Sequence, residues 1–239
     1  MSIKTVSLCQ IPAIIFLMKQ SKSVIVVAGG KGLRMNTDVP KQFLELAGKP
    51  VLMHTLERFY HFDNEIKITL VLPAEQIEYW KNLCKKHLFH IPHTVVSGGN
   101  ARFFSVKNGL EHIETEFVAV HDGVRPLVSF ETLERCFSAA EKSDAVVPVV
   151  DLVDSIRLVQ NEENSQPADR TKYKLVQTPQ VFRTEILKKS YLLPYSEYFT
   201  DDASVVEAAG YCVKLAEGNR ENIKITTAVD LKIAEMLLK

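Results

Sequence analysis

Short runs of apolar, β-branched residues alternate along the chain with longer amphipathic stretches. The short runs predict strands at 23–28, 66–72, 94–96, 117–121, 145–150, 213–215 and 223–225. The longer stretches predict helices at 51–60, 74–87, 102–113, 130–142, 184–192, 201–209 and 227–238. Strands and helices that alternate in this way are typical of β-α units. We therefore predict an α/β fold with a mainly parallel sheet flanked by helices.

The segment at 161–172 breaks this alternation, because it is polar and contains Pro167. It lies within a longer excursion from the predicted sheet, at about 151–177. One interpretation is a solvated surface loop. The other is an arm that packs on a partner subunit, since long segments in compact domains often have a function.

An apolar run at 11–18 precedes the first predicted strand. It is eight residues long and contains Pro12, so it is far shorter than the roughly 20 residues of a membrane-spanning helix. No small-residue cleavage site follows it. We expect 1–22 to be a dispensable leader, with translation starting at Met1 or Met18, and 23–239 to form a single domain.

Composition narrows the classes of partner. Lys plus Arg and Asp plus Glu both number 29, so no overall charge favours nucleic acid or an anionic membrane. The four cysteines are far apart and form no C-x-x-C pair, which favours a reducing, cytoplasmic location.

A glycine-rich turn follows the first predicted strand, with the sequence A-G-G-K-G-L-R-M at 28–35. Ligands bind at the carboxyl edge of open α/β sheets, and glycines let backbone amides approach a phosphate. The turn lacks the third glycine of the dinucleotide fingerprint and the G-K-S/T of a Walker loop. Arg34 and Lys41, which follows Pro40, add two cations to this edge of the sheet. A purely structural turn is the weaker alternative.

A second glycine turn, G-G-N-A-R-F-F-S at 98–105, precedes a predicted helix. Backbone groups of Gly98 and Gly99 are suited to reading a base edge, and Asn100 and Ser105 add hydrogen-bonding side chains. The alternative interpretation is a plain turn with capping residues.

The buried strand at 117–121 leads into Asp122, at the same predicted edge. Mg²⁺ often binds one or two protein carboxylates plus substrate phosphates, so Asp122 is the predicted metal ligand. The alternative is an ion pair between Asp122 and Arg125 that braces the turn.

Late in the chain, Lys224 alternates with Ile223 and Ile225, so its side chain is expected to point away from the apolar side.

Two other patterns resemble metal sites but have simpler explanations. The histidines at 87, 90 and 93 are interrupted by Pro92 and have no carboxylate nearby, which argues against zinc. Thr200, Asp201 and Asp202 stand at a predicted helix start, where acidic residues favour the helix dipole and Thr200 can cap.

Taken together, the motifs resemble those of the 2-C-methyl-D-erythritol 4-phosphate cytidylyltransferases, from about 23 to 238. The resemblance rests on A-G-G-K-G-L-R-M, P-K-Q-F, G-G-N-A-R-F-F-S-V, H-D-G-V-R-P, T-P-Q, T-D-D-A-S and E-G-N-R-E-N-I-K-I-T, in family order. It implies a Rossmann-like nucleotidyltransferase fold with a dimerisation arm. It also implies transfer of a cytidylyl group from CTP to a sugar-alcohol phosphate, with Mg²⁺.

The resemblance also implies roles for individual residues. Arg34 and Lys41 would be catalytic, Asp122 would hold the metal, and the arm would complete the site of a neighbouring subunit in a homodimer. The nucleotide would contact Ala28, Gly29, Gly30, Gly32, Gly99, Asn100, Ser105 and Arg125. The acceptor would contact Ser155, Arg170, Thr178 and Lys224.

Three other functions compete with this one. Ribitol 5-phosphate cytidylyltransferases share A-G-G-x-G, V-R-P and N-I-K-I-T, and would make CDP-ribitol. A nicotinamide oxidoreductase requires the complete glycine fingerprint. A non-catalytic nucleotide-binding protein would not need Lys41, Asp122 and Lys224 together.

Overall fold

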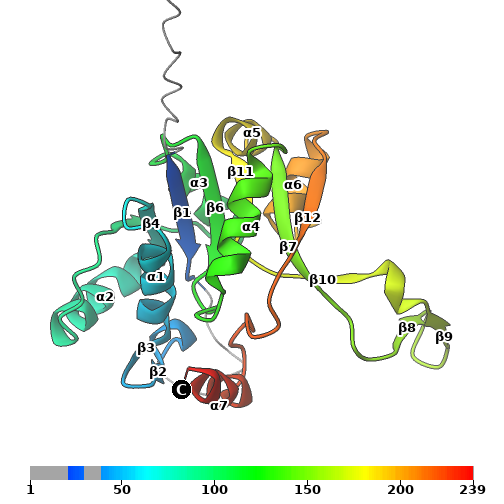
Figure 1. Ribbon diagram of the computed structural model, residues 1–239, viewed down its shortest axis with the longest axis horizontal. Helices are drawn as coiled ribbons and strands as arrows, with labels where there is room; N and C mark the ends of the chain where they lie inside the picture. Colours follow the sequence, from blue (N-terminus) through cyan, green and yellow to red (C-terminus); the bar gives the residue numbers. More distant parts are fainter. Residues whose placement is uncertain (1–20, 30–38, 239) are drawn as a thin grey trace, which may run out of the picture.

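The protein is described by a computed structural model that covers residues 21–29 and 39–238. An eight-stranded sheet forms its centre (Figure 1), in the order β10-β7-β11-β6-β1-β4-β5, with β12 also paired to β7. The strands are β1 Lys22–Val27, β4 Lys67–Leu72, β5 Thr94–Ser97, β6 Phe117–Asp122, β7 Ala145–Asp151, β10 Lys174–Val176, β11 Gln180–Arg183 and β12 Val213–Glu217.

The sheet is mainly parallel, as predicted. Strand β1 runs parallel to both β4 and β6, β5 runs parallel to β4, and β12 runs parallel to β7. Strands β10 and β11 are antiparallel to β7, and β11 also pairs with β6. The predicted α/β class is therefore confirmed, with an antiparallel return between β6 and β7.

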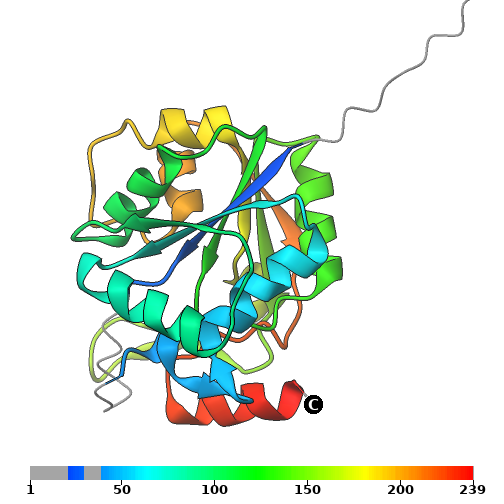
Figure 2. The same ribbon diagram turned by 90° about the vertical axis from the view of Figure 1, so that its left-hand side faces the viewer.

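Helices cover both faces of the sheet (Figure 2). They are α1 Val51–Phe62, α2 Ala74–Lys86, α3 Arg102–Leu110, α4 Phe130–Ala140, α5 Thr184–Ser190, α6 Asp202–Ala208 and α7 Ala228–Leu237. All seven predicted helices are confirmed. The shorter elements are η2 Lys41–Phe43, β2 Glu45–Leu46, β3 Lys49–Pro50, β8 Ile156–Val159, β9 Ser165–Ala168 and η3 Arg170–Lys172.

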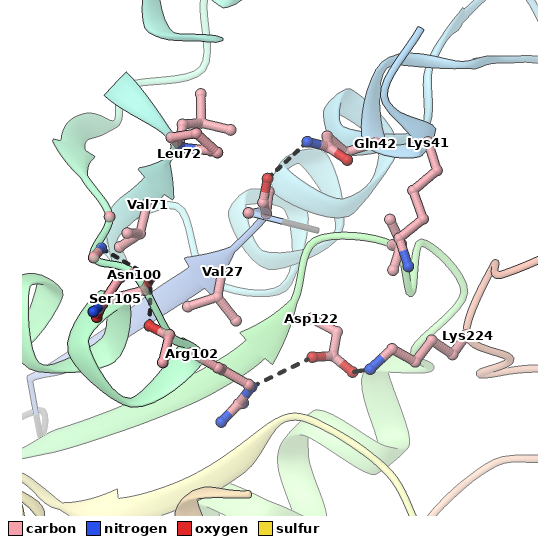
Figure 3. A pocket seen from close by; sticks show the side chains of 17 residues that line it. Val27, Lys41, Gln42, Val71, Leu72, Asn100, Arg102, Ser105, Asp122 and Lys224 are labelled. Carbon is pink, nitrogen blue, oxygen red and sulfur yellow. Dashed lines mark hydrogen bonds and ion pairs between the residues drawn. The ribbon is translucent and has the colours of Figure 1, made fainter. Parts of the chain in front are cut away.

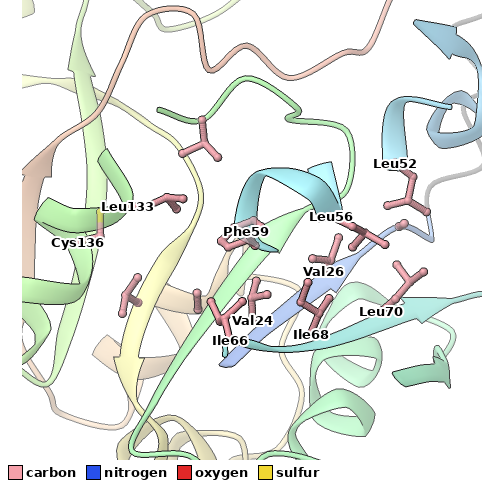
Figure 4. Packing of buried hydrophobic residues seen from close by; sticks show 14 of the residues in the cluster. Val24, Val26, Leu52, Leu56, Phe59, Ile66, Ile68, Leu70, Leu133 and Cys136 are labelled. Carbon is pink, nitrogen blue, oxygen red and sulfur yellow. The ribbon is translucent and has the colours of Figure 1, made fainter. Parts of the chain in front are cut away.

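The side chains of β1 alternate between two apolar layers, because successive residues of a strand point to opposite faces. Val24 and Val26 pack with α1, α2 and α4 (Figure 4). Ile25 packs with α3, α5 and α6 on the other face. Burial on both faces explains the continuous apolar run of this strand and fixes its carboxyl end in the centre of the molecule.

Two sequence predictions need correction. No strand forms at 223–225: only the Ile225 amide bonds across, to the Val124 carbonyl (2.9 Å), and the segment crosses the end of β6 in place of joining the sheet. The cap of α6 is Asp201, which accepts from the Ser204 amide at 2.9 Å, and not Thr200.

The excursion at 151–177 leaves the sheet at the end of β7 and returns as β10. It projects from the body and carries its own hairpin, β8 paired with β9 (Figure 1). Its apolar side chains at Val153, Leu158, Val159 and Tyr173 are half to two-thirds exposed. The segment thus lies outside the sheet and exposes apolar side chains to solvent. No helix in the described ranges is long and apolar enough to cross a membrane.

Candidate active site

A cavity of about 300 Å³ opens at the carboxyl ends of β1, β4 and β6 (Figure 3). The two glycine turns and the aspartate of β6 meet there, as the strand order requires. Eight predicted site residues line the cavity: Ala28, Gly29, Lys41, Gly99, Asn100, Ser105, Asp122 and Lys224.

The second glycine turn is held by the Ser105 hydroxyl. This hydroxyl accepts from the Gly99 amide and donates to the Ala101 carbonyl, both at 3.1 Å. A side chain at position 99 would place its Cβ 2.4 Å from Phe104 Cβ, so only glycine fits here. The turn thus presents backbone close to the cavity, as the base-reading interpretation requires.

Lys41 is positioned by its neighbour Gln42, whose side chain is fully buried. The Gln42 amide donates to the Ala28 carbonyl at 2.8 Å and to Gln76 Oε1 at 2.7 Å. These bonds tie η2 to the end of β1 and to α2. Lys41 therefore stands on an anchored turn at the cavity edge.

Three cations surround the carboxylate of Asp122, which is only 8% exposed. Lys224 Nζ lies 3.0 Å and Arg125 Nε 3.2 Å from Asp122 Oδ2. Arg102 Nε lies 4.0 Å from the other oxygen, Oδ1. Burial alone would raise the pKa of Asp122, but Arg102, Lys224 and Arg125 together hold it well below its usual range. The carboxylate is therefore ionised at neutral pH.

Arg125 lies beside the cavity and does not line it. Its guanidinium bonds Asp122 and also the Asn222 carbonyl, at 2.7 Å. It thus ties the turn after β6 to the segment that carries Lys224. The predicted brace exists, and it leaves Asp122 in the cavity wall.

Thr178 lies beneath the cavity, where it is buried. Its hydroxyl accepts from the Asp122 amide at 3.1 Å and lies 3.2 Å from His121 Nδ1. Burial lowers the pKa of His121 to about 4, so this imidazole is neutral at pH 7. Thr178 and His121 thus support the backbone that presents Asp122.

Ser155 and Arg170 are exposed on the arm, outside the cavity wall. Arg170 Nη1 donates to the Val153 carbonyl within the same arm. Within the described residues of one chain, the two predicted arm contacts are therefore not brought to the pocket. The predictions for Gly30, Gly32, Arg34 and most of the leader lie outside the described residues.

Residues 21–29 and 39–238 contain no group of three or more His, Cys, Asp or Glu side chains that could hold a metal ion. Of the histidines at 87, 90 and 93, His93 accepts a hydrogen bond from Trp80 Nε1 at 3.0 Å. Among the described residues that line the cavity, Asp122 is the one carboxylate, and this fits Mg²⁺, which binds largely through water and substrate phosphates.

Among the described residues that line the cavity, two polar side chains were not predicted from the sequence, those of Gln42 and Arg102. Gln42 stands within P-K-Q-F, but a glutamine beside an apparent surface lysine carries no distinct signal. Arg102 begins α3 directly after the glycine turn. A cation at that position of an anion-binding turn was a usable signal.

Comparison with known proteins places these features in a family. The chain matches the family described as IspD: 2-C-methyl-D-erythritol 4-phosphate cytidylyltransferase over residues 23–239. A protein of that name from Bacteroides thetaiotaomicron is 58% identical over 222 residues, which are 92% of this chain and 100% of the relative.

Solved structures agree with this match. The crystal structure of 2-C-methyl-D-erythritol 4-phosphate cytidylyltransferase from Thermus thermophilus is 31% identical with a TM-score of 0.74, over 91% of this chain and 98% of that one. The bifunctional IspDF from Campylobacter jejuni is 33% identical with a TM-score of 0.77, over 90% of this chain. This chain spans 54% of that longer protein.

Proposed function

The chain belongs to the 2-C-methyl-D-erythritol 4-phosphate cytidylyltransferase family, and we propose that the pocket around Lys41, Asp122 and Lys224 carries out the family's reaction. The protein is a nucleotidyltransferase that transfers the cytidylyl group of CTP to 2-C-methyl-D-erythritol 4-phosphate, in isoprenoid precursor biosynthesis. The match over residues 23–239 carries this conclusion, and it favours this acceptor over ribitol 5-phosphate.

The reaction joins two anions. A phosphate oxygen of the acceptor attacks the α-phosphorus of CTP, a new P–O bond forms, and the bond to pyrophosphate breaks. Two unit charges 4 Å apart repel by roughly 4 kcal/mol at an effective dielectric of 20. Lys41 and Lys224, with Arg34, supply the cations that offset this repulsion. The acceptor phosphate is already ionised at neutral pH, so no general base is required.

Asp122 is the residue that would hold Mg²⁺ together with the CTP phosphates. When bound, the ion would neutralise charge that develops on the phosphates. The donor chemistry supports this assignment, because Asp122 is an ionised carboxylate in the cavity wall and Mg²⁺ typically takes one or two such ligands. The backbone of Gly99, with Asn100, Ser105, Ala28 and Gly29, would receive the cytidine.

We assign the acceptor side to Lys224 and to a second copy of the chain. The exposed apolar side chains of the arm support a homodimer, in which Ser155 and Arg170 of one subunit reach the pocket of the other. The start of the family match at residue 23 supports a dispensable leader at 1–22. The dispersed cysteines support a cytoplasmic location.

The test is release of pyrophosphate from CTP and Mg²⁺ with each acceptor in turn, at equal enzyme concentration. We expect 2-C-methyl-D-erythritol 4-phosphate to be preferred. Preference for ribitol 5-phosphate would keep the pocket and reject the acceptor assignment. If the folded enzyme releases no pyrophosphate with either acceptor, the proposed reaction is wrong.

A further inference from the structure

A second carboxylate, Asp202, lies buried behind the pocket and takes no direct part in the transfer reaction. It is the first residue of α6 and is fully buried. Its Oδ1 accepts from Arg102 Nη1 at 3.0 Å and from the Tyr191 hydroxyl at 2.6 Å, and its Oδ2 accepts from Arg102 Nη2 at 2.7 Å. Asp202 thus grips the guanidinium of Arg102 with two parallel hydrogen bonds.

This carboxylate cannot follow Arg102 if the guanidinium moves toward the pocket. The amide of Ala203 donates to Gln180 Oε1 at 2.9 Å, and Gln180 Nε2 donates to Asp201 at 2.8 Å. Gln180 belongs to β11 and is fully buried, so the start of α6 is fixed to the central sheet. Tyr191 is also held, because its ring stacks on Phe103 with centroids 4.6 Å apart.

Arg102 lies between two carboxylates and is bound tightly by only one of them. Its distances to Asp202 are those of strong hydrogen bonds, whereas its closest approach to Asp122 is 4.0 Å, which is too long for one. Figure 3 shows Arg102 reaching from the start of α3 toward Asp122, opposite Lys224.

The two oxygens of Asp122 are therefore unequal. Arg125 and Lys224 contact Oδ2. Arg102 faces Oδ1 without bonding it. If Asp202 lost its charge, the guanidinium would have Asp122 as its nearest carboxylate, and a shift of about 1 Å would bring it into hydrogen-bond distance.

We infer that Asp202 is a positioning residue that holds Arg102 away from Oδ1 of Asp122 and so keeps this oxygen available to a divalent cation. The inference rests on the proposed role of Asp122 as the metal ligand. It gives a reason for burying a carboxylate behind the pocket, because a buried ion pair is by itself a weak source of stability.

The test measures the coupling between metal and nucleotide without turnover. Binding of CTP is titrated calorimetrically, with and without Mn²⁺ and with no acceptor present. The readout is the factor by which Mn²⁺ tightens CTP binding. The logarithm of this factor gives the coupling free energy between the metal and the nucleotide. We expect Asp202→Asn to reduce this factor about tenfold, because Arg102 then bonds Oδ1. Tyr191→Phe, which removes one donor to Asp202, should reduce it by a smaller amount.

The decisive variant is the double mutant Asp202→Asn/Arg102→Gln. If Asp202 acts by restraining Arg102, removal of Arg102 brings the factor back to within about threefold of wild type, a non-additive result. Asp201→Asn is the matched control, since Asp201 caps the same helix and does not contact Arg102; it should keep the wild-type factor. Circular dichroism establishes that each variant is folded.

Three results separate the possible failures. An unchanged factor in Asp202→Asn overturns the inference. A reduced factor that the double mutant does not restore also overturns it, because Asp202 then supports the fold only. If Asp122→Asn keeps the wild-type factor, the metal assignment itself is wrong, and the inference falls with it.

Discussion

The pocket and the arm differ in how far their side chains find partners within the same chain. Within the pocket, Asp122 has three cationic neighbours and Gln42 and Thr178 are buried and hydrogen-bonded. On the arm, apolar side chains are largely exposed and Arg170 bonds only its own arm among the described residues. One chain thus forms the pocket that we propose for the nucleotide. For the acceptor side, we propose that a second chain supplies the residues of the arm.

The largest expected effect concerns the pocket. Lys41→Ala should lower kcat by about 10²-fold or more, the scale found when a donor that stabilises transition-state charge is removed. We expect the same loss in Arg34→Ala. Steady-state kinetics measures it, and a loss under threefold in either variant would remove that residue from the catalytic role.

The comparison is tested most directly by mixing two inactive chains. Lys41→Ala breaks the pocket and Arg170→Ala breaks the arm, so a mixed dimer keeps one site with both parts intact. After equal mixing, half of the dimers are mixed, and about a quarter of wild-type activity should return. No recovery, despite chain exchange demonstrated by mass spectrometry, would show that the two residues do not share a site across subunits.

A smaller effect is expected for assembly alone. Val159 is 68% exposed on the arm, and Leu192 is 77% exposed on the body. Val159→Asp should weaken dimerisation by about tenfold, because it places a charge in an apolar contact, whereas Leu192→Asp should leave it unchanged. Sedimentation velocity measures both. Equal behaviour of the two variants would remove Val159 from the interface.

The smallest expected effect is a loss of stability at acidic pH, through a histidine in the body of the molecule. Burial lowers the pKa of His93 below 6.5, and its ring nitrogen accepts from Trp80 in the neutral form. As the pH falls below 6.5, His93 is protonated in the unfolded chain before it is protonated in the folded chain. The stability that neutral His93 contributes is therefore present above pH 6.5 and is lost as the pH falls toward the pKa of the folded state. One such histidine contributes at most about 1.4 kcal/mol per pH unit.

Urea unfolding at pH 7 and pH 5 measures this loss. His93→Gln should lose less stability between the two pH values than wild type, and the exposed neighbour His90→Gln should behave as wild type. An identical pH dependence in all three proteins would mean that His93 does not contribute to acid sensitivity.

The sequence predicted the elements whose apolar residues recur at the spacing of a strand or of a helix. The β-branched runs and helical periods located six of the eight central strands and all seven helices, and the glycine turns located the pocket. Strands β10 and β11 were not predicted, because Gln177, Pro179 and Gln180 interrupt their apolar pattern. The two glutamines are buried because tertiary partners satisfy them, such as α6 for Gln180.

The same limit applies to the site. Lys224 lines the cavity, although the strand that was predicted around it does not form. Asp202 was predicted to stand at a helix start and does so, but its ion pair with Arg102 was not predicted. Its ion pair with Arg102 joins residues 100 positions apart. Such a pair depends on how α3 and α6 lie on the sheet, and no local pattern encodes it.

The antiparallel return of the chain makes the arm a module. Asp151, where the arm leaves β7, lies opposite Lys174, where β10 begins. To the rest of the domain the whole excursion is therefore equivalent to one tight turn, whatever its length. The arm can therefore change in length or sequence while the strands that line the pocket keep their register. If the arm pairs subunits and completes the acceptor side, as we propose, these two properties can change without a change at the nucleotide side.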